Sequence, residues 1–242
     1  KNKDVPNWNH SLLNEDRIDF YPGINKDGDL CNMNNLLSYI KYIGNNTVDL
    51  VTGDGGFDYS EDYNKQEINS VPLIYSEIFL ALNLLKKGGC FICKVFDIFL
   101  KPTIQLLYIL TTCFCKTSIR KPNVSRLSNS EKYIVCTGYK GYNKKINNLL
   151  MRSFQKKDMS IQIDKNYQEK INQFNKIYSE IQVKQIQKGL LLIRTNKISN
   201  NPSLKQINEG ILWCKKYNIP INQYCYYIRG QSSHLGSKSA TE

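Results

Sequence analysis

A short apolar strand that ends in a glycine-rich turn limits most strongly what this 242-residue chain can fold into. Its sequence, VDLVTGDGGFDYSEDYNKQE, covers residues 48–67. The apolar residues Val48, Leu50 and Val51 predict a short buried strand, and the glycines after it allow a sharp turn or a close approach to a ligand. The turn contains a carboxylate, Asp54. Ligands bind at such strand ends in open α/β sheets, although a turn without chemistry explains the pattern equally well.

Two further charged residues lie in or beside predicted strands. The segment GCFICKVF, residues 89–96, carries Lys94 inside an apolar run, and Glu131 comes directly before the strand KYIVCT, residues 132–137. A charged residue in or beside a buried strand costs free energy unless it is paired or used. We therefore predict that Asp54, Lys94 and Glu131 meet in one site.

These segments resemble the FtsJ-like ribose 2'-O-methyltransferases, and most closely the cap methyltransferases and their relatives in large DNA viruses. The resemblance covers residues 20–138 and rests on TGDGG, CKVFD and KPNVSRLSNSEKYIVC. The DYNKQE run looks most like the cap-type and viral members. The family uses a Lys-Asp-Lys-Glu tetrad, whose last three members match Asp54, Lys94 and Glu131. The resemblance implies an S-adenosylmethionine-dependent methyltransferase that acts on RNA, with the mRNA cap as the expected acceptor.

The resemblance also implies where the methyl donor binds. Gly28, Asp29 and Leu30 stand where the family has a Gly-Asp-apolar triplet that contacts the donor's adenine, and Asp54 is expected to take part in donor binding as well. Asp29 could accept from the adenine amino group, while Leu30 packs on the ring or donates its backbone amide to a ring nitrogen. Without the family match, Asp27 and Asp29 would be ordinary turn residues.

The chemistry of ribose methylation asks for these residue types. A ribose 2'-hydroxyl is a poor nucleophile because its pKa lies far above neutrality, so its proton must be destabilised and its oxygen aligned with the methyl carbon. Lys94 would do the first, either as a neutral base or as an ammonium that stabilises the developing alkoxide. Asp54 and Glu131 would orient the lysines, and such close charges titrate as a group. No metal is required.

The chain departs from the family pattern at its start. The family's first tetrad lysine and its Gly-rich donor loop lie upstream of the triplet, and nothing in residues 1–27 matches either. One interpretation is that a partner subunit or a separate N-terminal segment completes the donor site. The alternative is a catalytically silent methyltransferase fold that serves as an RNA-binding or structural subunit. Retention of all three charged residues favours the enzyme.

The positive charge lies in the last part of the chain. Residues 1–139 hold 15 basic and 15 acidic side chains, whereas residues 140–242 hold 18 basic and 6 acidic, so the whole net charge of +12 belongs there. Such a balance favours attraction to nucleic-acid phosphates, and the basic loop 120–129 is a second candidate contact. The alternative is a solvated helical surface in a lysine-rich proteome.

The predicted fold class is α/β, a Rossmann-like methyltransferase sheet with helices on both faces and an apparently missing N-terminal part, followed by a C-terminal α-helical appendage. We expect a partial catalytic domain at residues 1–140, a basic α-helical region at 141–229 and a disordered tail at 230–242. The sheet is expected to be mostly parallel. Apolar periodicity predicts helices over residues 34–43, 67–87, 102–114, 167–194 and 203–217.

Eight cysteines fit neither a zinc site nor a disulfide framework. Cys90 and Cys93 form a C-x-x-C inside a predicted strand, where their side chains face opposite ways. We expect them, with Cys113, Cys115 and Cys136, to be buried reduced thiols, as in a cytoplasmic protein. A virus factory or a virion is the expected alternative location. No apolar run reaches 18 residues, so we expect no membrane partner.

Overall fold

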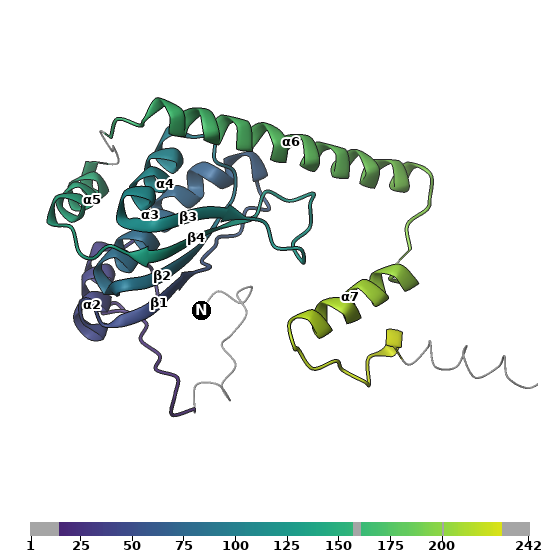
Figure 1. Cartoon of the computed structure of the whole chain (residues 1–242), viewed down its shortest axis with the longest axis horizontal. Helices are drawn as coiled ribbons and strands as arrows, with labels where there is room; N and C mark the ends of the chain where they lie inside the picture. Colours follow the sequence, from purple (N-terminus) through teal and green to yellow (C-terminus); the bar gives the residue numbers. More distant parts are fainter. Residues whose placement is uncertain (1–14, 157–160, 200, 229–242) are drawn as a thin grey trace, which may run out of the picture. The chain divides into compact units, whose positions relative to one another are not determined.

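The computed structural model describes residues 15–156, 161–199 and 201–228. The chain divides into two compact units, residues 1–185 and 186–242. The first unit contains a four-stranded sheet of order β1-β2-β4-β3 with helices packed against it (Figure 1). The predicted α/β class is therefore confirmed.

The sheet is mixed in the described part of the chain. Its strands are β1 (Val48–Gly53), β2 (Leu85–Val95), β3 (Phe114–Arg120) and β4 (Lys132–Tyr139). Only β1 and β2 pair in parallel, whereas β2 with β4 and β3 with β4 pair antiparallel. The prediction of a mostly parallel sheet is wrong because β3 was not expected. The loop from β3 to β4, residues 121–131, contains no crossover helix of the kind that a parallel connection needs.

Three helices of the first unit begin within one residue of the predicted positions: α2 (Met33–Ile43), α3 (Gln66–Leu84) and α4 (Lys101–Cys113). The 3-10 turn η1 (Tyr63–Lys65) and helix α5 (Lys144–Lys156) were not predicted. The predicted end of α3 at Gly88 and Gly89 is wrong, since β2 begins at Leu85. Gly88 has φ +89°, and the pairing of β1 with β2 shifts register there. The two glycines therefore form an irregularity within β2 and do not end the helix.

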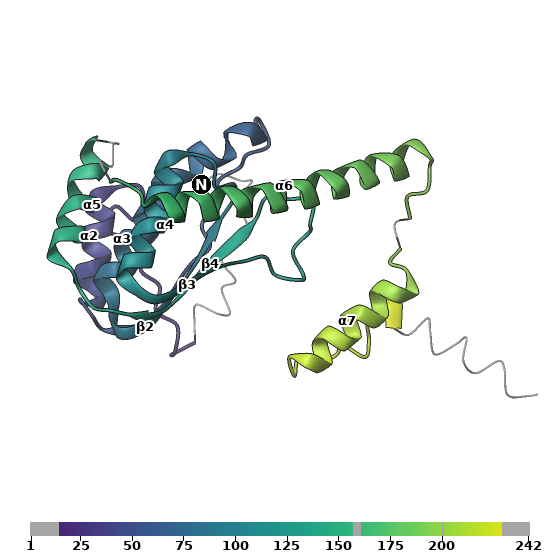
Figure 2. The ribbon, with the colours of Figure 1, turned by 45° about the horizontal axis from the view of Figure 1, so that its top comes forward.

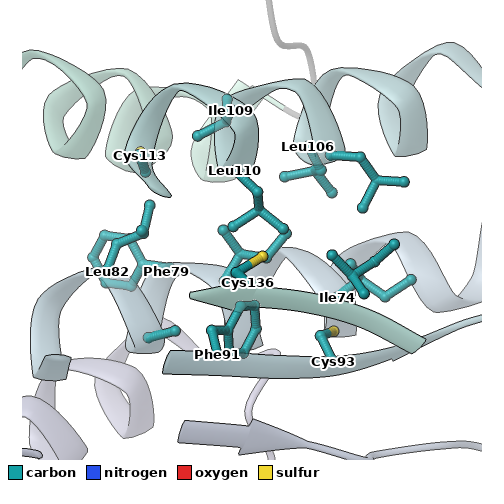
Figure 3. Close-up of a cluster of buried hydrophobic side chains, with 14 of the residues drawn as sticks. Ile74, Phe79, Leu82, Phe91, Cys93, Leu106, Ile109, Leu110, Cys113 and Cys136 are labelled. Carbon is teal, nitrogen blue, oxygen red and sulfur yellow. The ribbon is translucent and has the colours of Figure 1, made fainter. Parts of the chain in front are cut away.

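The hydrophobic core lies on one face of the sheet. Buried and less buried side chains alternate along β2 and β4, and Leu110 points from α4 toward Phe91 and Cys136 (Figure 3). Lys94 and Tyr133 are cross-strand partners. Each is adjacent in sequence to a core residue, so both lie on the opposite face of the sheet, where they are half-buried.

Helix α3 is buried on several sides. Its residue Glu77 contacts Cys93 of β2, whereas Tyr75 packs its ring 5.4 Å from that of Phe154 in α5 and donates a hydrogen bond to the carbonyl of Leu150. Figures 1 and 2 both show α5 beside α3. The sheet and α5 both cover α3, and the residues in the second half of this helix are therefore buried.

The long helix α6 (Lys165–Arg194) begins within the first unit. The ring of Tyr167 lies 5.1 Å from that of Tyr108, and the side-chain amide of Asn175 donates to the carbonyl of Ile98. The helix continues through Gly189, so the predicted helix over 167–194 is confirmed. Its first half packs on the first unit.

Helix α7 (Leu204–Lys216) belongs to the second unit, which also contains the end of α6. Ser203 and Gln206 form a reciprocal capping box at its start, which satisfies backbone donors that the helix leaves free. The predicted helix over 203–217 is confirmed within one residue at each end. The predicted tail, 230–242, lies outside the described residues, and the predicted domain boundaries stay predictions. None of the described helices combines the length and apolar character that a membrane span needs.

All eight cysteines are free thiols. Cys93, Cys113 and Cys136 are buried as predicted, but Cys90 is only half-buried and Cys115 is exposed. Cys115 lies on the edge strand β3, one residue after the buried Phe114, and the alternation along the strand turns it away from the core. Cys90 of β2 likewise lies on the face of the sheet opposite to the buried Phe91 and Cys93.

Candidate active site

The turn after β1 brings Asp54 against Lys94. The Lys94 Nζ lies 3.1 Å from the Asp54 Oδ1 and donates a hydrogen bond of 2.9 Å to the Asp54 carbonyl. The Asp54 side chain is 67% exposed and that of Lys94 18% exposed, so the pair opens to solvent on the Asp54 side. An ammonium has three N–H donors; within the described residues the Asp54 carbonyl takes one of them, and the Asp54 carboxylate pairs with the charge. The ammonium therefore has donor capacity left for a ligand oxygen.

Glu131 joins this pair through Tyr133. The Tyr133 hydroxyl donates to the Asp54 Oδ1 at 3.3 Å, and the nearby Glu131 carboxylate is a second acceptor for the same hydroxyl proton. Burial, together with these two carboxylates, raises the pKa of Tyr133 well above its usual value. The structure therefore connects all three predicted residues, with Glu131 linked indirectly. The sequence analysis missed Tyr133, although its position two residues after Glu131 on a strand places the two side chains on one face.

The loop between β3 and β4 holds the Glu131 carboxylate in place. Ser125 Oγ and the Asn129 side-chain amide lie 3.3 and 3.2 Å from the Glu131 Oε2. Lys121 donates to the carbonyls of Asn129 and Glu131, at 3.0 and 2.8 Å. Burial, and secondarily the nearby Lys132, lower the pKa of Lys121. Lys121 therefore stabilises the predicted basic loop from within, whereas the two arginines of that loop, Arg120 and Arg126, are exposed.

A buried carboxylate supports the Asp54 turn from the core side. Glu77 of α3 is 6% exposed, and its two oxygens accept from the Gly55 amide at 3.0 Å and from the Cys93 thiol at 3.2 Å. Burial raises the pKa of Glu77, while the two hydrogen bonds and the charge of Lys94 oppose that shift. The sequence analysis missed Glu77. A charged residue within the apolar stripe of α3 was the available signal.

The glycines of the turn are required by this close packing. A Cβ on Gly55 would lie 2.8 Å from the Glu77 Oε1 and 2.8 Å from a methyl of Leu73, and one on Gly53 would lie 2.6 Å from the Glu77 carboxyl carbon. These separations are shorter than any ordinary van der Waals contact, so a side chain at either glycine must displace the side chains of Glu77 or Leu73.

We expect Gly55→Ala to destabilise the protein by about 1–3 kcal/mol, the usual range for overpacking a well-packed interior. Urea unfolding measures the change. Gly189→Ala in α6 is the matched control, because a Cβ there meets nothing within 4 Å. A helical alanine should leave stability unchanged or raise it by up to about 1 kcal/mol. Equal stabilities for the two variants would show that the turn has more room than these contacts indicate.

The Gly28–Leu30 turn lies directly before α2. Gly28 has φ +71°, the Asp29 amide donates to Asp27 Oδ1 at 3.0 Å, and the Asp29 Oδ1 accepts from the Cys31 amide at 2.8 Å. The Asp29 side chain is exposed and that of Leu30 half-buried. Burial raises the pKa of Cys31 to about 11, and the carboxylates of Asp29 and Glu77 add to the shift.

The described residues contain no group of three or more histidine, cysteine or acidic side chains arranged to hold a metal ion.

Comparison with known proteins defines the class of protein. The family model described as FtsJ-like methyltransferase matches residues 4–139, more than half of the chain. The chain belongs to the FtsJ-like methyltransferase family.

Curated relatives are similar over part of their length. The chain is 38% identical over 122 residues to the human cap-specific mRNA (nucleoside-2'-O-)-methyltransferase 1, a match that covers 49% of this chain and 15% of the human protein. It is 30% identical over 199 residues to the Xenopus laevis protein of the same name, covering 74% of this chain and 23% of that protein. It is 32% identical over 191 residues to the 1A form from Caenorhabditis briggsae, covering 70% and 22%. The chain thus spans less than a quarter of each relative.

A solved structure is also similar. A chain described as a ribosomal RNA methyltransferase from Plasmodium falciparum superposes with a TM-score of 0.37 at 19% identity, over 51% of this chain and 63% of that one. Similarity at this level adds nothing to the family assignment.

Proposed function

We propose that this protein is an S-adenosylmethionine-dependent RNA ribose 2'-O-methyltransferase that acts on the mRNA cap. The observation that carries the proposal is the lysine–carboxylate pair of Lys94 and Asp54, which stands at a strand end and opens to solvent. Family membership supports the reaction type. The names of the human, frog and nematode relatives support the cap as the acceptor.

The site residues would act on the acceptor oxygen. S-adenosylmethionine, when bound, supplies a methyl group on a sulfonium that is already activated. Lys94 would contact the ribose 2'-oxygen through the donor that Asp54 leaves available, and would take up its proton or stabilise its developing negative charge. Asp54 fixes the direction of the Lys94 side chain by two contacts. The Tyr133 hydroxyl and the Glu131 carboxylate are further polar groups beside Asp54.

The donor set of the Gly28–Leu30 turn fits the adenine end of the methyl donor. Asp29 offers an exposed carboxylate as an acceptor for the amino group, and the half-buried Leu30 offers an apolar surface for the ring. Residues 15–27 contain no Gly-rich loop for the remainder of that molecule. A separate segment or a partner subunit that completes the donor site is therefore part of the proposal. A catalytically silent RNA-binding or structural subunit is the second candidate, favoured by the same observation.

We also propose a cytoplasmic location, including a virus factory or virion, for a protein of viral source. Eight free thiols support a reducing compartment. The resemblance of the DYNKQE run to viral members of the family supports the source.

The test of the proposed activity is transfer of a labelled methyl group to capped and uncapped RNA by the full-length natural protein. Digestion of the product locates the label. We expect it on the ribose 2'-oxygen of a nucleotide next to the cap. Label on uncapped RNA alone would replace the cap with another acceptor, and no label on either RNA would favour the silent subunit.

We expect Asp29→Ala to weaken binding of S-adenosylmethionine, because the exposed carboxylate is the proposed acceptor for the adenine amino group. Loss of one hydrogen bond to a charged group corresponds to about 1.5–3 kcal/mol. Isothermal titration calorimetry on the full-length protein measures the change. Asp62→Ala is a matched control, since Asp62 also accepts from the amide two residues on, that of Asn64 at 3.0 Å. Equal affinities of wild type and Asp29→Ala would remove Asp29 from the donor site.

A further inference from the structure

One peptide group of the candidate site is held at both ends. The carbonyl of Asp54 and the amide of Gly55 belong to the same peptide unit. Lys94 Nζ donates to that carbonyl at 2.9 Å, and the amide donates to the Glu77 Oε1 at 3.0 Å. A trans peptide is planar and directs its C=O and N–H to opposite sides, so Lys94 and Glu77 hydrogen-bond this peptide group from opposite directions.

The same contacts form a closed connection through β2. The second Glu77 oxygen accepts from the Cys93 thiol at 3.2 Å. Cys93 precedes Lys94, and the two side chains point to opposite faces of the sheet. Gly53 of β1 pairs with Cys93 in the sheet register. The Asp54 peptide is thus fixed to β2 on one face by Lys94 directly and on the other face by Glu77 and Cys93.

Stability alone does not account for a carboxylate at this position. Burial raises the pKa of Glu77, so the folded protein binds its proton more tightly than the unfolded chain does. The contribution of such a group to stability falls as the pH rises from its unfolded pKa through its folded pKa. Ionised Glu77 therefore costs folding free energy above that range. Local costs of this kind are expected at functional sites, where a group is kept for positioning.

We propose that Glu77 is the positioning residue of the active site, which holds the Asp54–Gly55 peptide so that its carbonyl and the adjacent carboxylate bind Lys94 in the geometry that the reaction requires. The role in the reaction rests on the proposed methyltransferase function. The role in holding the peptide is independent of it. Glu77 acts through Asp54 and Lys94 and does not touch the RNA.

Two variants separate the acceptor of Glu77 from its charge. Glu77→Gln keeps an oxygen that can accept from the Gly55 amide but carries no charge, whereas Glu77→Leu keeps the bulk and removes the acceptor. Glu67→Gln is the matched control. Glu67 lies on the same helix, is also buried, and accepts from the backbone amides of Phe99 and Leu100 at 3.0 and 2.8 Å.

The Gly55 amide can be observed directly by NMR. The chain contains two Asp-Gly dipeptides, at residues 27–28 and 54–55. Labelling aspartate carbonyls with carbon-13 and glycine amides with nitrogen-15 therefore selects the Gly28 and Gly55 signals. Gly28 serves as the internal reference, because its amide donates to the backbone carbonyl of Pro22 at 2.9 Å.

We expect the Gly55 signal of the wild type to exchange slowly with solvent and to titrate with a pKa above the ordinary glutamate value of 4.5. The charged groups that influence this titration are Lys94 and Asp54; the neutral Cys93 thiol donates a hydrogen bond to Glu77, and the Cys31 thiol is a further titratable neighbour. Glu77→Gln should keep the slow exchange and lose the titration, and Glu77→Leu should lose both. An unchanged Gly55 signal in Glu77→Leu would overturn the proposal. If that variant does not fold, continued titration of Gly55 in Glu77→Gln overturns it.

Kinetics test the role in the reaction. Displacement of a catalytic group by about 1 Å can lower the rate by about 10²-fold. We expect Glu77→Leu to lower kcat by about that factor with KM for RNA unchanged, Glu77→Gln to recover most of the activity, and Glu67→Gln to match the wild type. Wild-type kcat in Glu77→Leu would overturn the catalytic part. Absence of transfer by the wild type would refute the proposed function, while the Gly55 signals would still decide whether Glu77 holds the peptide.

Discussion

Lys94→Ala should lower methyl transfer to the ribose 2'-hydroxyl by about 10²- to 10⁴-fold, the usual cost of removing a positioned acid or base. The fold and the affinity for RNA should change little. The partner that the substitution leaves behind, Asp54, is mostly exposed, so water replaces the lost ammonium there. The buried Glu77 loses a favourable charge and can compensate by taking up a proton. Labelled methyl transfer and a filter-binding assay with the same RNA measure the two effects.

Lys86→Ala is the control for this substitution. Lys86 lies on the same strand and also pairs with an aspartate of β1, at 3.1 Å from Asp49. That pair is exposed and far along β2 from Lys94, so its loss should leave methyl transfer unchanged. Full activity of Lys94→Ala would show that another residue handles the acceptor proton. An equal loss in both variants would indicate a general effect of charge.

The charged residues of the site were predictable because they violate the pattern around them. Lys94 stands in an apolar strand and Asp54 in a glycine turn after one, and the structure joins them at 3.1 Å. The link between Glu131 and this pair was not predictable, since it depends on the Tyr133 hydroxyl. A tyrosine in a strand gives the same sequence pattern whether its ring packs in the core or its hydroxyl contacts carboxylates of an active site.

The supporting carboxylate shows a second limit. Glu77 lies at a distance of 23 residues from Asp54, and only the packing of α3 on the sheet brings it to Gly55. Periodicity places Glu77 on the buried stripe of the helix but does not say which strand it meets. The sequence also does not show why the turn needs glycines. A Cβ at Gly53 or Gly55 would collide with the side chain of Glu77 or Leu73, and this contact too depends on how α3 packs on the sheet.

The two errors in the predicted fold concern a pair of glycines and a short strand. Two adjacent glycines, Gly88 and Gly89, are typical of a helix end, but here they accommodate a register shift within β2. The segment CKTSIR of β3 alternates weakly and follows α4 without a loop. Local pattern alone therefore missed the strand, and with it the antiparallel half of the sheet.

The basic residues of α5 are arranged as a surface. Ile146 and Phe154 pack against the hydrophobic core, whereas Lys144, Lys145 and Arg152 are exposed. Helix α5 contacts the Tyr75 side of α3, and the Asp54 turn contacts the Glu77 side. A phosphate backbone bound along α5 would therefore add affinity without touching the reacting atoms, as contacts that position a nucleic acid do.

We expect the triple variant Lys144→Glu, Lys145→Glu, Arg152→Glu to weaken RNA binding at every sequence tested. It should also lower the steepness of the salt dependence. Each phosphate contact to single-stranded nucleic acid contributes about 0.7 to the slope of log affinity against log salt, because bound counterions are released. Loss of three contacts should therefore reduce the slope by about 2. Fluorescence anisotropy between about 50 and 200 mM salt covers a range in which such proteins lose several orders of magnitude in affinity.

Reversal of Lys41, Lys87 and Lys116 is the control for this triple variant. These lysines are also exposed, so the control changes net charge by the same amount but lies in the electrically balanced part of the chain. If only the α5 variant loses slope, the position of the charge matters, and α5 is an RNA-binding surface. If both variants lose slope equally, the attraction is a general effect of net charge. An unchanged slope in both would assign the basic residues of α5 to another partner.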